Sequence, residues 1–230
     1  MNREEKAMRK IFPIILLCIC IGSCGGNRDY GAKFSSSERI TVGVLDFDRN
    51  ANDEKLEQYR KSLTDMFITE LWKMPELRPV ERSRLDAVMS EFELGELGIL
   101  DSETIQKIGR ALGAQALYYG GFILLPEGKM LRLDARLVRV ETSEVLAAGE
   151  GTAKKISDKE LLKVVRVQAK KIASAVKESH KELIADNFYS KGETAEDEKD
   201  KSSAIANYQK ALQYYPGHEK SREALARLQQ

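Results

Sequence analysis

Residues 116–153 read ALYYGGFILLPEGKMLRLDARLVRVETSEVLAAGEGTA, and this stretch decides the fold. It opens with a nearly continuous apolar run, continues with apolar residues that mostly alternate with charged ones, and closes with a third strand-like segment. The turn-forming segments PEGK and ETSE separate these parts. The pattern predicts a meander with one face exposed to solvent, whose strands lie at 116–125, 131–140 and 145–153.

Upstream of this block, strands and helices alternate. Residues 38–48 (ERITVGVLDFD) alternate and are rich in β-branched side chains, which predicts a strand. Apolar residues from Leu56 to Trp72 recur at three- and four-residue steps, which predicts an amphipathic helix that ends before Pro75. The remaining predicted elements are a strand at 77–80, a helix at 82–92, and a helix that Asp101 and Ser102 cap and Gly113 ends.

Downstream of the block, the sequence is helical. Ser157 and Glu160 have the spacing of a capping box, and apolar residues then recur at helical spacing as far as Leu183. The polar face of this predicted helix is rich in lysine, which is typical of a solvated face; binding to a membrane surface or to nucleic acid is the alternative. The predicted fold class is α/β (α+β), a mixed sheet with packed helices, followed by a C-terminal α-helical hairpin.

From Ile40 to about Glu150 the chain resembles the CsgG-like family, which includes the curli secretion channel and smaller periplasmic lipoproteins. The segments that carry the resemblance are VGVLDF at 42–47, PVER at 79–82 with LDAV at 85–88, IGRALGAQAL at 108–117 and ARLVRVETSEVL at 135–146. The resemblance implies a CsgG-like mixed sheet and an envelope role without a reaction centre in these segments.

The sequence departs from the channel member of this family at two places. The channel builds its barrel from two long hairpins, and the corresponding places here are only residues 122–132 and 148–155. A membrane-spanning strand needs about 9–11 residues, and each hairpin needs two such strands. The sequence therefore favours the non-channel branch of the family.

The last part of the chain resembles one tetratricopeptide repeat. Its spacing is carried by Phe188, Gly192, Ala204, Tyr208, Ala211 and Pro216, with Tyr208 filling the groove between two helices. An ordinary helical hairpin is the alternative. Roughly three repeats are needed for independent stability, so a single unit has to pack on the preceding helix or on a partner.

The N-terminus has the layout of an export signal. A basic start precedes an apolar run at 11–21, which is too short to span a membrane untilted. Ile21-Gly22-Ser23-Cys24 resembles a bacterial lipobox, which implies cleavage before Cys24 and acylation of that residue; a plain signal peptide or a buried helix is the alternative. The expected segments are a signal peptide at 1–23, a flexible tether at 24–37, a CsgG-like domain at 38–184 and a tetratricopeptide-like hairpin at 185–230.

Composition and motifs exclude several kinds of chemistry. The 230-residue chain has a formal net charge of +1, which argues against a nucleic-acid partner. No HExxH or CxxC motif and no GxSxG motif occurs, so we expect no cofactor, no metal and no catalytic residue. His180 and His218 lie in lysine-rich surroundings and are expected to be exposed. Asp46 and Asp48 are two apart at a strand end, where capping of the loop is favoured over an acid–base pair.

These observations predict a non-enzymatic lipoprotein on the periplasmic face of the outer membrane. The outer membrane is favoured because the residue after the lipidated cysteine is Gly25 and not the aspartate that retains lipoproteins at the inner membrane of enteric bacteria. The expected partners are the membrane, through Cys24, an unidentified envelope protein, and a second copy of the chain as an open possibility. Exposed aromatic residues favour interfaces, so Tyr208, Tyr214 and Tyr215 are the predicted partner contacts. An oligomeric secretion channel and an enzyme acting on glycan or nucleotide through Asp46 are the rival hypotheses.

Overall fold

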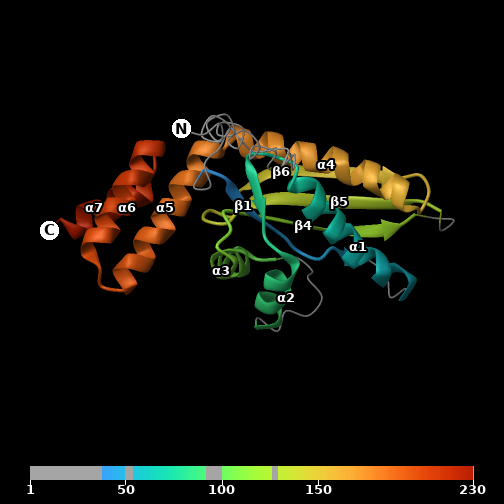
Figure 1. Ribbon diagram of the computed structural model, residues 1–230, viewed down its shortest axis with the longest axis horizontal. Coiled ribbons are helices and arrows are strands. Elements are labelled where there is room, and N and C mark those ends of the chain that lie inside the picture. The colour runs from blue at the N-terminus through green and yellow to red at the C-terminus, as the bar shows by residue number, and fades with distance from the viewer. Residues whose placement is uncertain (1–37, 50–53, 92–99, 126–128, 230) are drawn as a thin grey trace, which may run out of the picture.

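A mixed β-sheet forms the centre of the protein (Figure 1). The computed structural model describes residues 38–49, 54–91, 100–125 and 129–229. The strands are β1 (Ile40–Val44), β2 (Asp48–Arg49), β3 (Leu77–Pro79), β4 (Ala116–Leu124), β5 (Leu131–Arg139) and β6 (Val145–Ala153). They pair in the order β3-β1-β4-β5-β6, and β2 also pairs with β4. β1 is parallel to β3 and β4, whereas β4, β5 and β6 are antiparallel neighbours, as the meander pattern predicted.

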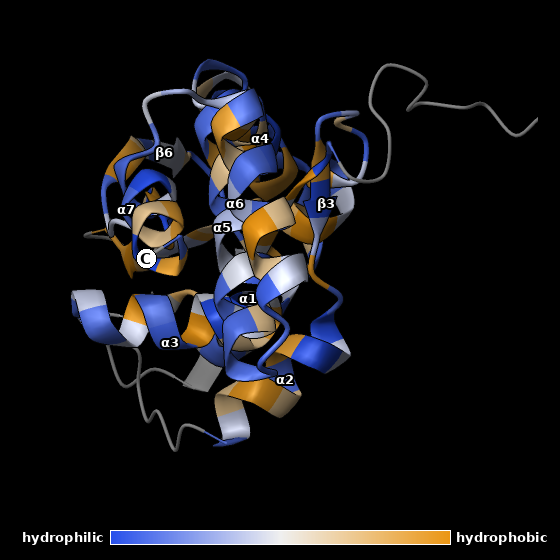
Figure 2. Ribbon diagram, turned by 90° about the vertical axis from the view of Figure 1, so that its left-hand side faces the viewer, coloured by the Kyte–Doolittle hydropathy of each residue, from blue (hydrophilic) through white to orange (hydrophobic). Residues whose placement is uncertain are grey.

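Helices cover both faces of this sheet. α1 (Glu54–Leu71) and α4 (Asp158–Glu178) pack on one face, where they share the main hydrophobic core with β1, β4 and β5. α2 (Arg82–Glu91) and α3 (Ser102–Leu112) cover part of the other face around a second core. Figure 2 shows hydrophobic and hydrophilic residues interleaved along α4, as expected of a helix that buries one side. The predicted α/β fold class is confirmed.

The alternating pattern of the sequence separates the two faces of β5. Four of its apolar residues are at most 4% exposed and lie in the main core, namely Leu131, Leu133, Ala135 and Leu137, whereas Val138 lies in the second core. The residues between them point the other way, and there Arg132 pairs with Asp134 and Glu150. This face is exposed along much of the strand, as predicted.

α3 begins and ends where the sequence indicated. The Asp101 side chain accepts a hydrogen bond of 2.7 Å from the backbone N–H of Thr104. At the other end Gly113 adopts φ 65°, a left-handed conformation, and its N–H bonds to the carbonyl of Arg110. The chain then enters β4 directly, which places the C-terminal end of α3 beside the sheet.

Two local predictions need correction. The first strand is shorter than predicted, because β1 ends at Val44 and residues 45–47 leave it, carrying the Asp46 carboxylate toward α1 and α2. Ser157 precedes α4 as predicted, but its side chain makes no capping hydrogen bond. Its backbone carbonyl accepts from the N–H groups of Glu160 and Leu161 instead.

The single helix predicted to reach Leu183 is two helices. α4 ends at Glu178 and α5 (His180–Asp197) begins after Ser179, so the expected domain boundary at 184/185 lies inside α5. The break lets Leu183 remain in the main core while Asp186 faces the end of β5. α6 (Lys201–Tyr214) and α7 (Glu219–Leu228) follow, and Figure 1 shows α5–α7 projecting from one end of the sheet.

We call α5–α7 the tail and the rest of the described chain the core. No helix within the described residues is long and apolar enough to cross a membrane.

Candidate functional site

The tail packs on the core through apolar contacts of its own. Ala185, Phe188 and Ala211 belong to the main hydrophobic core, so the tail shares that core with α1, α4 and the sheet. Within the tail, Tyr208 is fully buried between α5 and α6, and a Cβ added at Gly192 would overlap its ring. The tail is therefore docked on its own chain.

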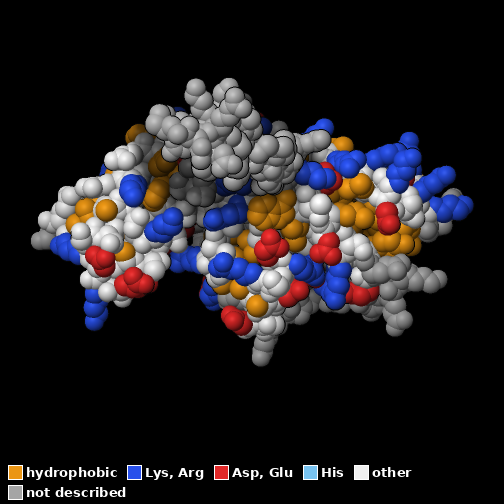
Figure 3. All heavy atoms as spheres, viewed as in Figure 1, with side chains coloured by type: hydrophobic (Ala, Val, Ile, Leu, Met, Phe, Trp, Pro, Cys, Tyr) orange, Lys and Arg blue, Asp and Glu red, His pale blue; other side chains and the backbone are white. Residues whose placement is uncertain are grey.

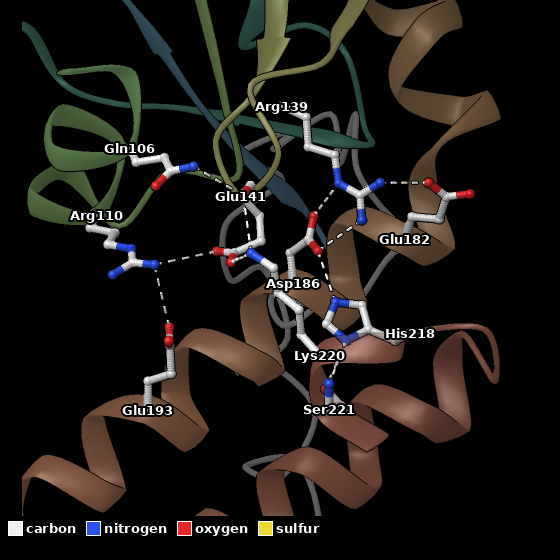
Figure 4. A network of polar contacts seen from close by, with 10 residues as sticks. All are labelled: Gln106, Arg110, Arg139, Glu141, Glu182, Asp186, Glu193, His218, Lys220 and Ser221. Carbon is white, nitrogen blue, oxygen red and sulfur yellow. Dashed lines mark hydrogen bonds and ion pairs between the residues drawn. The ribbon is translucent and has the colours of Figure 1, made fainter. Parts of the chain in front are cut away.

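A network of charged side chains spans the same junction (Figure 4). Arg139 is the last residue of β5, and its side chain is 9% exposed. Its Nε and Nη2 donate to the two carboxylate oxygens of Asp186 on α5, at 2.7 and 2.8 Å. Its Nη1 donates to Glu182 Oε2 at 2.7 Å. The guanidinium thus binds one carboxylate in a bidentate manner and a second from the next turn of the same helix.

Asp186 also accepts a hydrogen bond from His218, the residue that precedes and caps α7. His218 Nε2 lies 3.0 Å from Asp186 Oδ1, and His218 Nδ1 lies 3.2 Å from the backbone nitrogen of Ser221 and 2.8 Å from its Oγ. Because the Ser221 N–H donates to Nδ1, the ring hydrogen sits on Nε2 and is donated to Asp186. Burial raises the pKa of Asp186, but the hydrogen bonds from His218 and Arg139 outweigh this effect and the net shift is downward.

This serine, histidine and aspartate arrangement caps a helix. The ring of His218 caps the N-terminus of α7, and Ser221 is fully buried, so its hydroxyl does not meet solvent. The ring is also reversed relative to hydrolytic triads, in which Nε2 faces the serine. His218 was predicted to be exposed, and that prediction is wrong: the side chain is 5% exposed.

A second arm of the network joins α3 and α7 to the turn after β5. Glu141 is 5% exposed, and its carboxylate accepts from Lys220 of α7. Arg110 of α3 lies 3.9 Å from Glu141 and 3.7 Å from Glu193 of α5. Gln106 donates to the Glu141 carbonyl at 3.3 Å. The two arms, which we call the junction network, fix the orientation of α5 relative to the sheet.

A groove of about 770 Å³ lies between the core and α5. One wall is formed by the core, including Trp72, β3 and the C-terminal end of α3, and the other by the side of α5 from Asp186 to Thr194. Figure 3 shows Lys and Arg side chains along the boundary between tail and core. The cations that line the groove are Arg39, Arg78, Arg84, Arg110 and Lys191, and its carboxylates are Glu81, Glu141 and Asp186.

The charges in the groove do not cancel. Glu141 and Asp186 are already bound by cations of the junction network. In the described part of the chain, neither Arg78 nor Lys191 has a carboxylate within ion-pair distance; Arg78 donates to Thr41 Oγ1 at 2.8 Å, and the Lys191 ammonium lies 5.2 Å from the Phe188 ring centre. Burial and the positive charges of Arg78 and Lys210 lower the pKa of Lys191. We call this groove, with all of its lining residues, the cationic groove. Trp72, one of these residues, is 44% exposed.

The predicted partner contacts are not among the residues that line this groove, and they differ in exposure. Tyr208 is fully buried and donates to Glu196 at 2.5 Å, so the expectation that it is exposed is wrong. Tyr214 is half-buried and stacks on Phe188 with ring centres 5.5 Å apart, and Tyr215 is half-buried against the main core. Cys24, the predicted lipidation site, lies outside the described residues.

The other candidate residues have structural contacts. Asp46 lies 2.6 Å from Arg82 Nη1 and 3.3 Å from Arg60 Nη1, and accepts from Thr64 at 3.1 Å, so it anchors a loop to α1 and α2. Asp48 lies in β2. His180 is half-buried, with its Nε2 2.8 Å from the carbonyl oxygen of Glu38. Among the residues that the structure describes, no cluster of His, Cys, Asp and Glu is arranged to hold a metal ion.

Comparison with known family models supports the CsgG-like resemblance over the first part of the core. Residues 26–129 match the family model described as curli production assembly/transport component CsgG. The chain is similar to the C-terminal domain of LpoB from Salmonella enterica, with 17% identity over 55% of this chain and 90% of that chain and a TM-score of 0.40. It is also similar to lipoprotein GNA1162 from Neisseria meningitidis, with 13% identity over 58% and 96% of the two chains and a TM-score of 0.41. No curated protein matches the sequence.

A third similar structure is the PelC dodecamer from Paraburkholderia phytofirmans, with 14% identity over 60% of this chain and 88% of that chain and a TM-score of 0.35. The tetratricopeptide-like interpretation of the tail stays a prediction.

Proposed function

We propose that this chain is a non-enzymatic lipoprotein of the bacterial cell envelope that binds another envelope protein at the cationic groove. The observation that carries this proposal is a groove lined by the half-exposed Trp72 and four arginines, whose far wall is held in place by the junction network. Tryptophan and arginine are the residues most enriched among interface hot spots. A pre-organised groove also loses less conformational entropy when a partner binds.

The match of residues 26–129 to the CsgG family model supports an envelope role. Within this proposal, Cys24 carries the lipid anchor, and the protein lies on the periplasmic face of the outer membrane. Several acyl chains hold a protein on a bilayer, at about 0.8 kcal/mol for each buried CH₂. The anchor keeps the groove close to partners in the same membrane.

The short connections favour this role over a secretion channel. β4 and β5 are joined by residues 125–130, and β6 leads to α4 through residues 154–157. Neither connection has the length of a membrane-spanning hairpin, which needs two strands of about 9–11 residues each.

A site-specific photocrosslinker tests the proposal in living cells. Placed at position 72, it should capture one defined protein, whereas the matched control at Val167, an exposed apolar residue on α4, should not capture that protein. Mass spectrometry identifies the captured chain. Absence of any protein adduct specific to position 72 would overturn the proposal.

A further inference from the structure

We propose that the part of the partner that enters the cationic groove is an acidic peptide segment, with two or more carboxylates and one apolar side chain. This inference rests on the proposed function and names the chemistry of the partner. Two observations support it: the groove has an excess of positive charge without counter-charge, and Trp72 gives it an apolar surface.

The positive charge of the groove comes from three side chains that face it without a carboxylate partner in the described part of the chain. Arg78 uses its guanidinium on the Thr41 hydroxyl, Arg84 makes a long hydrogen bond of 3.4 Å to a backbone carbonyl, and Lys191 lies over an aromatic ring. All three side chains are exposed on the groove. Carboxylates placed between β3 and α5 would therefore meet unused donors from both walls.

The same cations repel one another in the absence of a ligand. Partial burial is the main cause that lowers the pKa of Lys191, and the positive charges of Arg78, in the groove, and of Lys210, outside it, lower the pKa further. An anion in the groove removes this repulsion, so part of the binding free energy comes from relief within the protein itself. The one carboxylate lining the groove that the junction network does not bind is Glu81.

The lining is mixed, and this favours a peptide over a bilayer or a nucleic acid. Besides the cations, it contains the amides of Gln115 and Asn187 and apolar residues from β3, the end of α3 and the turn after β5. Its volume of about 770 Å³ falls in the range of about 300–1,000 Å³ typical of ligand pockets. A flat lipid surface cannot enter a cleft between two walls, and a near-neutral chain lacks the charge on which nucleic-acid binders depend.

Phage-displayed random dodecapeptides selected on the full-length protein in detergent test this inference. We expect enriched peptides in which Asp and Glu outnumber Lys and Arg and which contain an aromatic or large aliphatic residue. Synthetic copies should bind at least ten-fold more weakly to Arg78→Glu and Lys191→Glu variants, and their affinity should fall as salt rises. The matched control is Lys163→Glu, an exposed lysine on α4, which should change the affinity less than two-fold.

Lys191 is exposed, so its variant should keep the native circular dichroism spectrum even if Arg78→Glu does not. Neutral or basic enriched peptides, or equal binding by all variants, would overturn the inference. The inference would also be overturned if the protein sedimented with phosphatidylglycerol vesicles and the same two substitutions abolished this sedimentation, since that result identifies a membrane as the ligand. If the crosslinker at position 72 captures a specific protein but the selected peptides show no preference for acidic residues, only the partner chemistry is rejected. If the crosslinker captures no specific protein, the proposed function is rejected.

Discussion

Removal of the Asp186 carboxylate is expected to destabilise the whole protein. Asp186→Ala leaves the Arg139 guanidinium 9% exposed, with Glu182 as its remaining carboxylate, and removes the acceptor of His218. Removal of one partner of a buried ion pair costs about 3–5 kcal/mol. Because Glu182 still binds Nη1 at 2.7 Å, we expect a loss at the lower end, about 3 kcal/mol.

Thermal and urea unfolding, followed by circular dichroism, measure this loss. At roughly 2–4 °C per kcal/mol for a chain of this size, Tm should fall by about 6–12 °C. The matched control is Asp134→Ala, which removes an aspartate that pairs with Arg132 on the open face of β5, with side chains 52% and 42% exposed. Exposed pairs are screened by water and salt, so this variant should unfold nearly as the native protein does. Equal midpoints for the two variants would refute the reasoning.

Three further predictions concern pH, packing and the anchor. Because the folded state lowers the pKa of Asp186, the contribution of its carboxylate to stability is complete above the unfolded pKa of about 3.9 and disappears as pH falls through the folded pKa. The Tm difference between the native protein and Asp186→Asn should therefore be constant from about pH 5 to 8 and shrink below about pH 4. A Tm difference that shrinks near neutrality would contradict this assignment. Replacement of a helix glycine by alanine ordinarily stabilises a protein by about 0.5–1 kcal/mol. At Gly192 the new Cβ would overlap the ring of Tyr208, so Gly192→Ala should lower the free energy of unfolding by about 1–3 kcal/mol in urea titrations. A gain in stability would disprove the packing argument. Cys24→Ser should leave a chain that is neither cleaved nor acylated, and an unchanged mature mass by intact mass spectrometry would reject the anchor.

The core was predictable where the signals are local. The alternation in residues 131–140 defines which side of β5 is buried, and Asp101 and Gly113 mark the ends of α3 through contacts within a few residues. The mixed topology could be expected from the CsgG-like resemblance. The break between α4 and α5 was missed because the apolar spacing continues through Ser179 without a glycine or proline.

The candidate site was largely hidden, because its contacts join distant parts of the chain. Arg139 and Asp186 are 47 residues apart, and Glu141 and Lys220 are 79 apart. A buried arginine at the end of an alternating strand has the same local pattern as an exposed one. His218 lies in a lysine-rich segment that is typical of a solvated helix, and its burial follows from contacts with Asp186, Ser221 and the ring of Tyr189. Tyr208 shows the converse, since its repeat-like spacing predicted the inter-helix position that it occupies.

The junction network has a consequence for biosynthesis. Ribosomes deliver a chain from its N-terminus, so Arg139 emerges 47 residues before Asp186 and His218 emerges a further 32 residues later. Until Glu182 and Asp186 have arrived, the Arg139 cation lacks its counter-charges, and the apolar face of the sheet stays partly uncovered until Phe188 and Ala211 arrive. The sheet therefore reaches its full set of contacts only after the tail has been synthesised, and a product truncated within the tail is expected to be less stable and to be degraded faster.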